Sequence, residues 1–386
     1  MNNQTNKKQI VINQKFFINS NVEDYVYYKD DFKNYKKLSD CFVIEKKDNK
    51  DFYKSEEFIE HYFNVSEKNI PDNLTLKKLS DKKRIDHSLY VYFIGTILIK
   101  NGIFKNIENI IEKKDDVLYY WFLIAMFHDF GYMIELDSIK YILNKSNSFY
   151  PLKYNYNLKI YPIEYNLFEH KFISRNHEIN SIEKCSLYSP NTFKLYYKYR
   201  IEQMFSLDHG ILGGLLLYNF LCENYFNRRN TAENKIKNKD NNEEIFEWNK
   251  RTFQKTDFDI YAYCSYAIAQ HNIYRSDNGT TSVKYLAYGL DELIGTDKKF
   301  NKNKNPFSFL LGLVDTIEVT KRDINFEDIN IVFNKKQNRI EFIFEDMIDK
   351  KEDKENHLKT IKDLSNWLEV DTKLDKQNNS VTIEIL

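Results

Sequence analysis

Four apolar segments of helical length each carry a histidine, either inside the segment or at its end. They are 85–100 with His87, 116–128 with His128, 206–223 with His209, and 258–271 with His271. Segments that are apolar on nearly every face are typical of helices buried in a bundle. A fifth apolar segment, 306–320, starts with Asn305-Pro306, a pair that favours a helix start. The pattern therefore predicts a mainly α-helical core over about 81–322.

Two aspartates share this apolar setting. Asp129 follows His128 directly, and Asp315 lies inside the fifth segment. An unpaired charge buried in such a helix costs several kcal/mol, so each carboxylate needs a cation. No Lys or Arg lies within a helical turn of Asp129, and the nearest one to Asp315 is Lys321. Bound metal ions would supply the charge, and imidazole with carboxylate ligands suits Fe, Mn, Co, Ni or Zn better than Mg or Ca.

For each residue taken alone, the alternative is structural. A single histidine in an apolar helix is more often a hydrogen-bonded core residue, and a single His-Asp pair arises by chance. The ordered set is more specific, because six such residues in five separate helices would surround one core. The six predicted metal ligands are His87, His128, Asp129, His209, His271 and Asp315.

Around these residues the sequence resembles the HD superfamily of metal-dependent phosphohydrolases, over roughly residues 84–320. The motifs that carry the resemblance are Asp86-His87, His128-Asp129-Phe130-Gly131-Tyr132, Asp208-His209-Gly210, Gln270-His271-Asn272 and Leu313-Val314-Asp315. The resemblance implies an HD-domain helical bundle with a dinuclear metal site. By position, it gives the first ion the ligands His87, His128 and Asp315. It gives the second ion His209 and His271, with Asp129 as the bridge, so that His128 and Asp129 are the central catalytic residues.

The resemblance further implies hydrolysis of a phosphoester. Two divalent ions activate a bridging hydroxide that attacks phosphorus, so no protein nucleophile is needed. We therefore expect an enzyme of the phosphodiesterase or phosphatase class that acts on a nucleotide or another small phosphorylated substrate. Two positions depart from many phosphodiesterase members. Tyr132 stands where they have Lys, and Asn272 follows His271 where they often have a second His.

Three other functions stay open from the sequence. The same ligand set resembles that of di-iron oxygenases in the superfamily, and similar sites occur in nucleases that act on single-stranded nucleic acid. The third is a nucleotide-binding sensor or scaffold without turnover. Extended nucleic acid is the less favoured partner, because 57 Lys and Arg balance 57 Asp and Glu. Lys-rich stretches at 33–54 and 234–255 keep the nuclease alternative open.

Substrate contacts are expected from residues close to the ligands in sequence. The predicted contacts are Arg84, Tyr132 and Arg275, with Lys321 and Arg322 as further candidates. Arg84 shares a helix face with His87, which it precedes by three residues. Asp86 and Asp208 each precede a ligand histidine and would either orient the imidazole or cap a helix, and the cap is preferred for Asp208. The remaining histidines, in polar surroundings and expected at the surface, are His61, His170, His177 and His357.

The rest of the chain is predicted to form appendages to the core. Residues 1–80 read as a polar, partly helical lead-in. Within the core, 140–205 is an aromatic-rich insertion suited to a lid or substrate cap, and 226–257 is a charged excursion. Residues 325–386 predict a small C-terminal α+β module, with a hairpin of 329–333 and 340–344, a charged helix at about 352–368 and a terminal strand. A protein partner or a second copy would contact this module.

Cysteine use and hydropathy give the expected compartment. The four cysteines show no CxxC pair, which favours reducing cytosol over a disulfide framework. The N-terminus lacks the apolar run of a secretion signal, and the most apolar stretch, 118–127, is about half the length of a membrane span. We therefore expect a soluble cytoplasmic protein.

Overall fold

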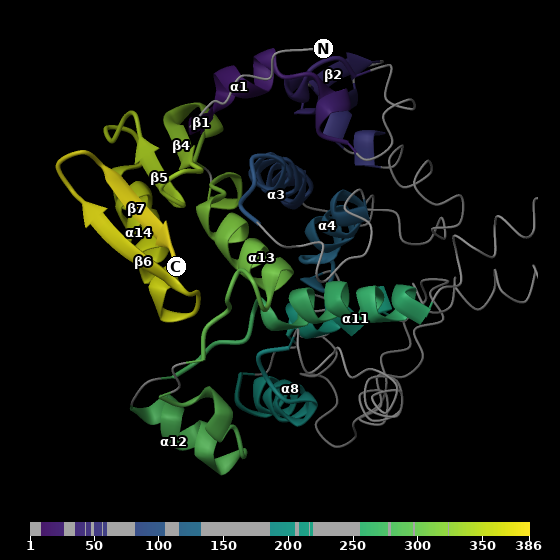
Figure 1. Cartoon of the computed structure of the whole chain (residues 1–386), viewed down its shortest axis with the longest axis vertical. Coiled ribbons are helices and arrows are strands. Elements are labelled where there is room, and N and C mark those ends of the chain that lie inside the picture. The colour runs from purple at the N-terminus through teal and green to yellow at the C-terminus, as the bar shows by residue number, and fades with distance from the viewer. Residues whose placement is uncertain are drawn as a thin grey trace, which may run out of the picture. The chain divides into compact units, whose positions relative to one another are not determined.

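The computed structural model describes residues 9–26, 35–42, 44–47, 50–55, 57–59, 82–104, 116–132, 186–204, 208–215, 217–218, 255–276, 279–295, 298–322 and 324–386. The chain divides into two compact units. The first contains Met1–Lys68, Leu76–Met126 and Lys298–Leu386, and the second Asn69–Thr75 and Phe127–Asp297. Figure 1 shows the chain with its element labels.

Some sequence predictions lie outside the described residues. These are the expected lid apart from 186–204, the charged excursion apart from 255–257, and His61, His170 and His177. The division of the chain at 80, 322 and 325 stays a prediction.

Three apolar helices of the first unit begin and end close to the predicted positions. They are α3 (Lys82–Lys100), α4 (Asp116–Phe127) and α13 (Pro306–Ile317), and α13 starts with its proline in the first turn as expected. α3 packs against α13. Trp121 of α4 donates its indole N–H to the Tyr92 carbonyl of α3 at 2.9 Å, and its ring lies where a side chain at Gly95 would have to go. Gly95, which has no side chain, thus lets α3 and α4 approach closely.

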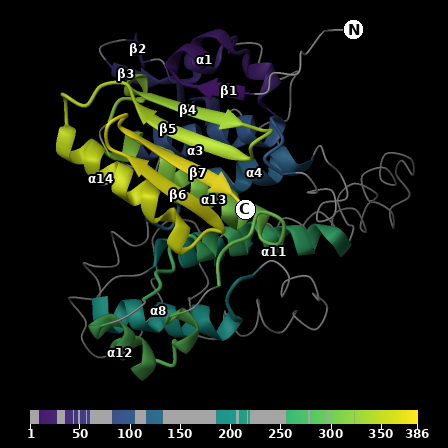
Figure 2. The same cartoon turned by 60° about the vertical axis from the view of Figure 1, so that its left-hand side comes forward.

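An antiparallel sheet of five strands completes the first unit, in the order β1-β4-β5-β7-β6. The strands are β1 (Gln9–Ile12), β4 (Ile329–Asn334), β5 (Arg339–Phe344), β6 (Val370–Asp375) and β7 (Ser380–Ile385). Burial alternates along β4 and β5, as it does in strands with one face on a core. The helix α14 (Lys351–Lys362) packs against β6 and β7, as Figure 2 shows. The predicted hairpin and C-terminal α+β arrangement are confirmed, whereas β1 adds a strand that the sequence analysis did not predict.

His357 of α14 is buried, so its predicted surface position is wrong. Its ring lies against Phe342 and Phe344 of β5, with ring centroids 5.3 and 6.1 Å apart. The helix itself was predicted, but its charged composition hid its buried face, where residues recur at one-turn spacing as Lys354, His357, Leu358 and Ile361. Burial, and then the Arg322 guanidinium, lower the pKa of His357 well below its ordinary value.

The N-terminal part of the first unit contains shorter elements. They include α1 (Gln14–Asn19) and the small hairpin of β2 (Ile44–Lys47) with β3 (Lys50–Tyr53). Phe17 of α1 packs edge-on against Phe93 of α3 and Phe326, with centroids 6.2 and 5.0 Å away. Part of the expected lead-in therefore contributes to the core of the first unit.

The second unit is helical in its described residues. Its helices are α8 (Pro190–Met204), α11 (Lys255–Gln270) and α12 (Thr280–Ala287), and residues 209–215 are also helical. A Cβ added at Gly214 would lie 2.4 Å from the Ser265 carbonyl oxygen of α11. Gly214 thus allows the backbones of this segment and α11 to approach closely. Tyrosines join α8 to α12, with the Tyr199 and Tyr285 rings in edge contact at 4.9 Å.

The described residues are thus mainly helical, with a small antiparallel sheet. Among the helices that the structure describes, none combines the length and the apolar character that a membrane crossing requires.

Candidate metal centre

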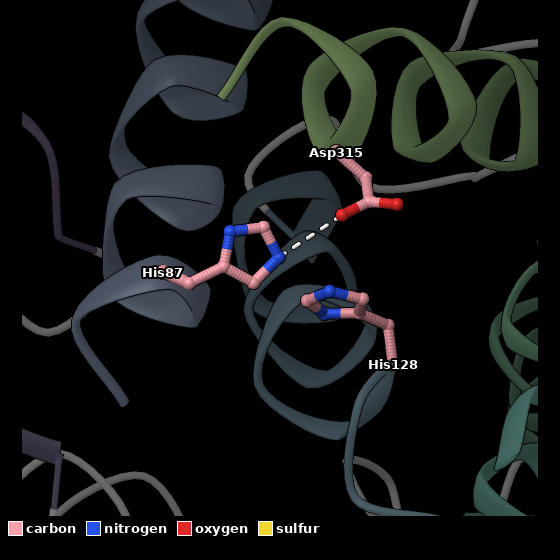
Figure 3. A group of neighbouring side chains, drawn as sticks. All are labelled: His87, His128 and Asp315. Carbon is pink, nitrogen blue, oxygen red and sulfur yellow. Dashed lines mark ion pairs between the residues drawn. The ribbon is translucent and has the colours of Figure 1, made fainter. Parts of the chain in front are cut away.

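A first group of potential metal ligands contains His87, His128 and Asp315. His87 comes from α3 and Asp315 from α13, and His128 is the residue directly after α4 (Figure 3). One donor atom from each residue lies within 4.8 Å of the other two. His87 Nε2 and Asp315 Oδ1 are 3.0 Å apart. Both histidines are buried, while the Asp315 side chain is 20% exposed, so this carboxylate is less buried than its apolar sequence context predicts.

Glu318 holds the other side of the His87 ring. It follows α13 and is completely buried, and its carboxylate forms a hydrogen bond with His87 Nδ1. Its second oxygen accepts from the Thr320 backbone N–H at 2.8 Å. A carboxylate on one imidazole nitrogen fixes the tautomer, so the opposite nitrogen is presented to a metal ion. Glu318 is not among the predicted site residues, because a single Glu after a helix carries no distinctive signal.

The pKa values of this pair shift in opposite directions. Burial and the Lys321 ammonium lower the pKa of His87, but the Glu318 and Asp315 carboxylates outweigh them and raise it overall. Burial raises the pKa of Glu318, but His87 and the hydrogen bonds from Thr320 outweigh it and lower the pKa overall. Without a bound metal ion, both shifts favour an ionised Glu318 beside a protonated His87.

Lys321 forms an ion pair with Asp315 Oδ1, and its Nζ lies 3.5 Å from His87 Nε2. Asp315 therefore has a protein cation within reach, contrary to the expectation from the sequence. α13 ends at Ile317, and the 3₁₀ turn Thr320–Arg322 brings Lys321 back toward the carboxylate six residues earlier. A straight helix would have separated these two side chains, and the helix end determines the contact.

A second group of potential ligands contains Asp129, His209 and His271, again with donor atoms within 4.8 Å of one another. Asp129 lies in the turn after α4, and His271 directly follows α11. The turn passes very close to His209, since a Cβ at Gly131 would lie 2.0 Å from the His209 carbonyl oxygen. Only glycine fits there without moving one of the two segments. Gly131 of the predicted motif thus sets the distance between Asp129 and His209.

Polar neighbours hold the two imidazoles of the second group. His271 Nδ1 lies 2.5 Å from the Ile268 carbonyl oxygen, so it donates there and leaves Nε2 for a ligand. The Asn272 amide donates to Asp208 Oδ2 at 2.9 Å and lies 3.3 Å from His209 Nδ1. Asp208 also accepts from the Ile211 backbone N–H at 2.8 Å, which is the predicted capping interaction.

Asp129 Oδ1 connects the two groups. It lies 3.5 Å from His128 Nε2, which belongs to the first group, and 3.9 Å from His209 Nε2, which belongs to the second. The Asp129 side chain is 3% exposed, and the rings of His128 and His271 have centroids 5.6 Å apart. One buried carboxylate oxygen therefore faces imidazole nitrogens of both groups.

The predicted substrate contacts have different settings. Tyr132 stacks on the His209 ring at a centroid distance of 3.6 Å and an angle of 18°. It is partly exposed, as are Arg84 in α3 and Arg275, which lies beyond α11. Their contact with a substrate stays a prediction.

The donor sets fit a transition metal. Each group offers two imidazole nitrogens and one carboxylate, which are ligands of Fe, Mn, Co, Ni and Zn. Donors that bind one ion at about 2.1 Å lie about 3.0 Å apart at a right angle and about 3.4 Å apart at the tetrahedral angle. The 3.0 Å between His87 Nε2 and Asp315 Oδ1 equals the right-angle distance. The 3.9 Å between Asp129 Oδ1 and His209 Nε2 exceeds both distances, so these two donors would have to move slightly closer to bind one ion.

Comparisons of the chain with models of protein families, with curated proteins and with solved structures found no significant match.

Proposed function

We propose that the protein is a metal-dependent phosphohydrolase in which the two ligand groups form one dinuclear centre. His128 belongs to the first group and Asp129 to the second. Consecutive Cα atoms are about 3.8 Å apart, so two ions bound by these groups would be close neighbours. The resemblance of the six ligands and their motifs to the HD superfamily supports the same arrangement.

The observation that carries this proposal is the position of Asp129 Oδ1, which faces His128 at 3.5 Å and His209 at 3.9 Å. A carboxylate between two ions can donate one oxygen to each or share one oxygen between them. Asp129 would then bridge the ions, and its burial excludes the water that would otherwise compete for the ligand positions.

When bound, two such ions lower the pKa of a water shared between them and neutralise charge on the phosphoryl oxygens. The protein residues position this chemistry. Glu318 holds the tautomer of His87, and the Ile268 carbonyl does the same for His271. Arg84, Arg275 and Tyr132 are the proposed contacts for a small phosphorylated substrate such as a nucleotide.

The test begins with full-length protein purified without chelator and analysed for its metal content. The protein is then loaded with Mn²⁺ or Fe²⁺ and assayed against bis(p-nitrophenyl) phosphate and a panel of nucleotides. We expect two metal ions per chain and metal-dependent release of nitrophenol or phosphate. Asp371→Asn, on the exposed side of β6, is the control for a lost carboxylate outside the site.

Two results would contradict the proposal. One is a protein that binds two metal ions yet hydrolyses none of the phosphoesters. The other is consumption of O₂ by the iron-loaded protein with a polyol or a phosphonate, without hydrolysis, because that result indicates an oxygenase.

A further inference from the structure

Lys321 contacts two of the three donor residues of the first ligand group. Its ammonium is hydrogen-bonded to Asp315 Oδ1 and lies 3.5 Å from His87 Nε2, and these two donor atoms are 3.0 Å apart. A metal ion bound to both donors would have to lie about 2.1 Å from each of them. The ammonium therefore takes up the side of Asp315 and His87 on which such an ion would bind.

The backbone around Lys321 is well fixed, but its side chain has room to move. The Arg322 N–H bonds to the Val319 carbonyl at 2.9 Å, and the Arg322 guanidinium bonds to the Glu318 carbonyl at 2.8 Å. These bonds anchor the turn that carries the lysine. The Lys321 side chain is 29% exposed, so its ammonium can leave Asp315 without any change in the backbone.

We infer that Lys321 has two alternative partners: the Asp315 carboxylate when the first group holds no metal ion, and an oxygen of a bound phosphoryl group when it does. A divalent cation bound to this carboxylate oxygen would repel the ammonium, and the ammonium would move away from Asp315. The displaced ammonium stays tethered a few ångströms from the ion, where a negatively charged phosphoryl group would bind. This inference rests on the proposed function, and specifically on metal binding by the first group.

The experiment compares full-length wild-type protein with Lys321→Met in two titrations. Mn²⁺ is titrated first, and the binding step that His87→Ala abolishes is assigned to the first group. Inorganic phosphate is then titrated into the Mn²⁺-loaded proteins. We expect Lys321→Met to bind Mn²⁺ about tenfold more tightly, because the internal competitor is gone, and phosphate about tenfold more weakly, because a charged hydrogen bond is lost.

The opposite directions of these two changes distinguish the inference from a structural role, since loss of a structural lysine would weaken both affinities. Lys321→Arg retains a cation of similar reach and should stay near the wild type in both titrations. Lys373→Met removes a positive charge from the exposed side of β6, outside the site, and should change neither affinity by more than about twofold.

The inference is overturned if Lys321→Met binds Mn²⁺ no more tightly than the wild type, or if its phosphate affinity is unchanged. It is also overturned if Lys373→Met gives the same shifts, because the cause is then long-range charge. These outcomes leave the proposed function intact. A wild-type protein that binds no Mn²⁺ overturns both.

Discussion

His87 and His271 belong to different ligand groups, and different partners hold their rings. His87 Nδ1 is bonded to the buried Glu318 carboxylate, whereas His271 Nδ1 donates to the Ile268 backbone carbonyl. Both partners fix the tautomer, but only the carboxylate also adds negative charge and makes the ring a more basic ligand. The first group would therefore depend on one replaceable side chain. The second is held in part by backbone, which substitution does not remove.

The largest effect is expected from Asp129→Ala, which removes the residue that faces both groups. The variant should lose both metal ions and lower phosphoester hydrolysis on the order of a thousandfold, because no other carboxylate replaces the bridge. Elemental analysis and the nitrophenol assay measure these losses. His209→Ala is the matched change in one group and should release chiefly the second ion. Retention of two ions by Asp129→Ala would exclude a bridging role.

The next largest effect is expected from Gly131→Ala, because the turn that contains Gly131 passes very close to the backbone of His209. In Gly131→Ala the new methyl group would lie 2.0 Å from the His209 carbonyl oxygen, and a backbone atom cannot move aside cheaply. We expect the free energy of unfolding to fall by about 3 kcal/mol and the second ion to bind more weakly. Denaturant titration and metal analysis measure the two effects.

Gly312→Ala in α13 provides the control for this prediction. There the new methyl group meets the flexible end of Leu368 at 3.3 Å, and alanine favours the helix. Its free energy of unfolding should stay within about 1 kcal/mol of the wild type. Equal destabilisation by the two substitutions would show that the close approach at Gly131 has no special importance.

Glu318→Gln tests the difference between the two groups directly. Loss of the carboxylate that holds His87 should weaken metal binding by the first group about 10- to 100-fold and leave the second group unchanged. Asn272→Ala, the comparable change near His209, removes a neutral group and should weaken the second group only about fivefold. Titration with Mn²⁺ measures both affinities. A smaller effect for Glu318→Gln than for Asn272→Ala would reverse the proposed difference.

The smallest effect concerns His357, a buried histidine that belongs to neither group. Burial and Arg322 lower its pKa, so the folded protein keeps it neutral where the unfolded chain would protonate it. Its contribution to stability is present above the unfolded pKa of about 6.5 and is lost as the pH falls below that value, by up to about 1.4 kcal/mol per pH unit. In His357→Leu this loss should disappear. Unfolding free energies measured between pH 7.5 and 5.5 test this, and identical pH profiles for the two proteins would contradict it.

The sequence predicted the helices that carry His87, His128 and Asp315, because long apolar segments leave little choice but buried helices. The hairpin of β4 and β5 was equally predictable from its alternating pattern. The contacts of Glu318 and Lys321 were not, because they depend on where α13 ends and how the next turn folds back. His357 was wrongly predicted at the surface, because the charged composition of its helix was given more weight than the one-turn spacing of the buried residues.

The position of β1 has a consequence for the assembly of the chain. Asn13, directly after β1, is hydrogen-bonded to Asn330 of β4, 317 residues later. During synthesis the first strand therefore leaves the ribosome long before its partner exists, and contacts across such a span form late. Without Gln9–Ile12, the backbone groups along one side of β4 would face solvent and could pair with another chain. The N-terminal strand thus covers an edge formed by residues more than 300 positions further along the chain.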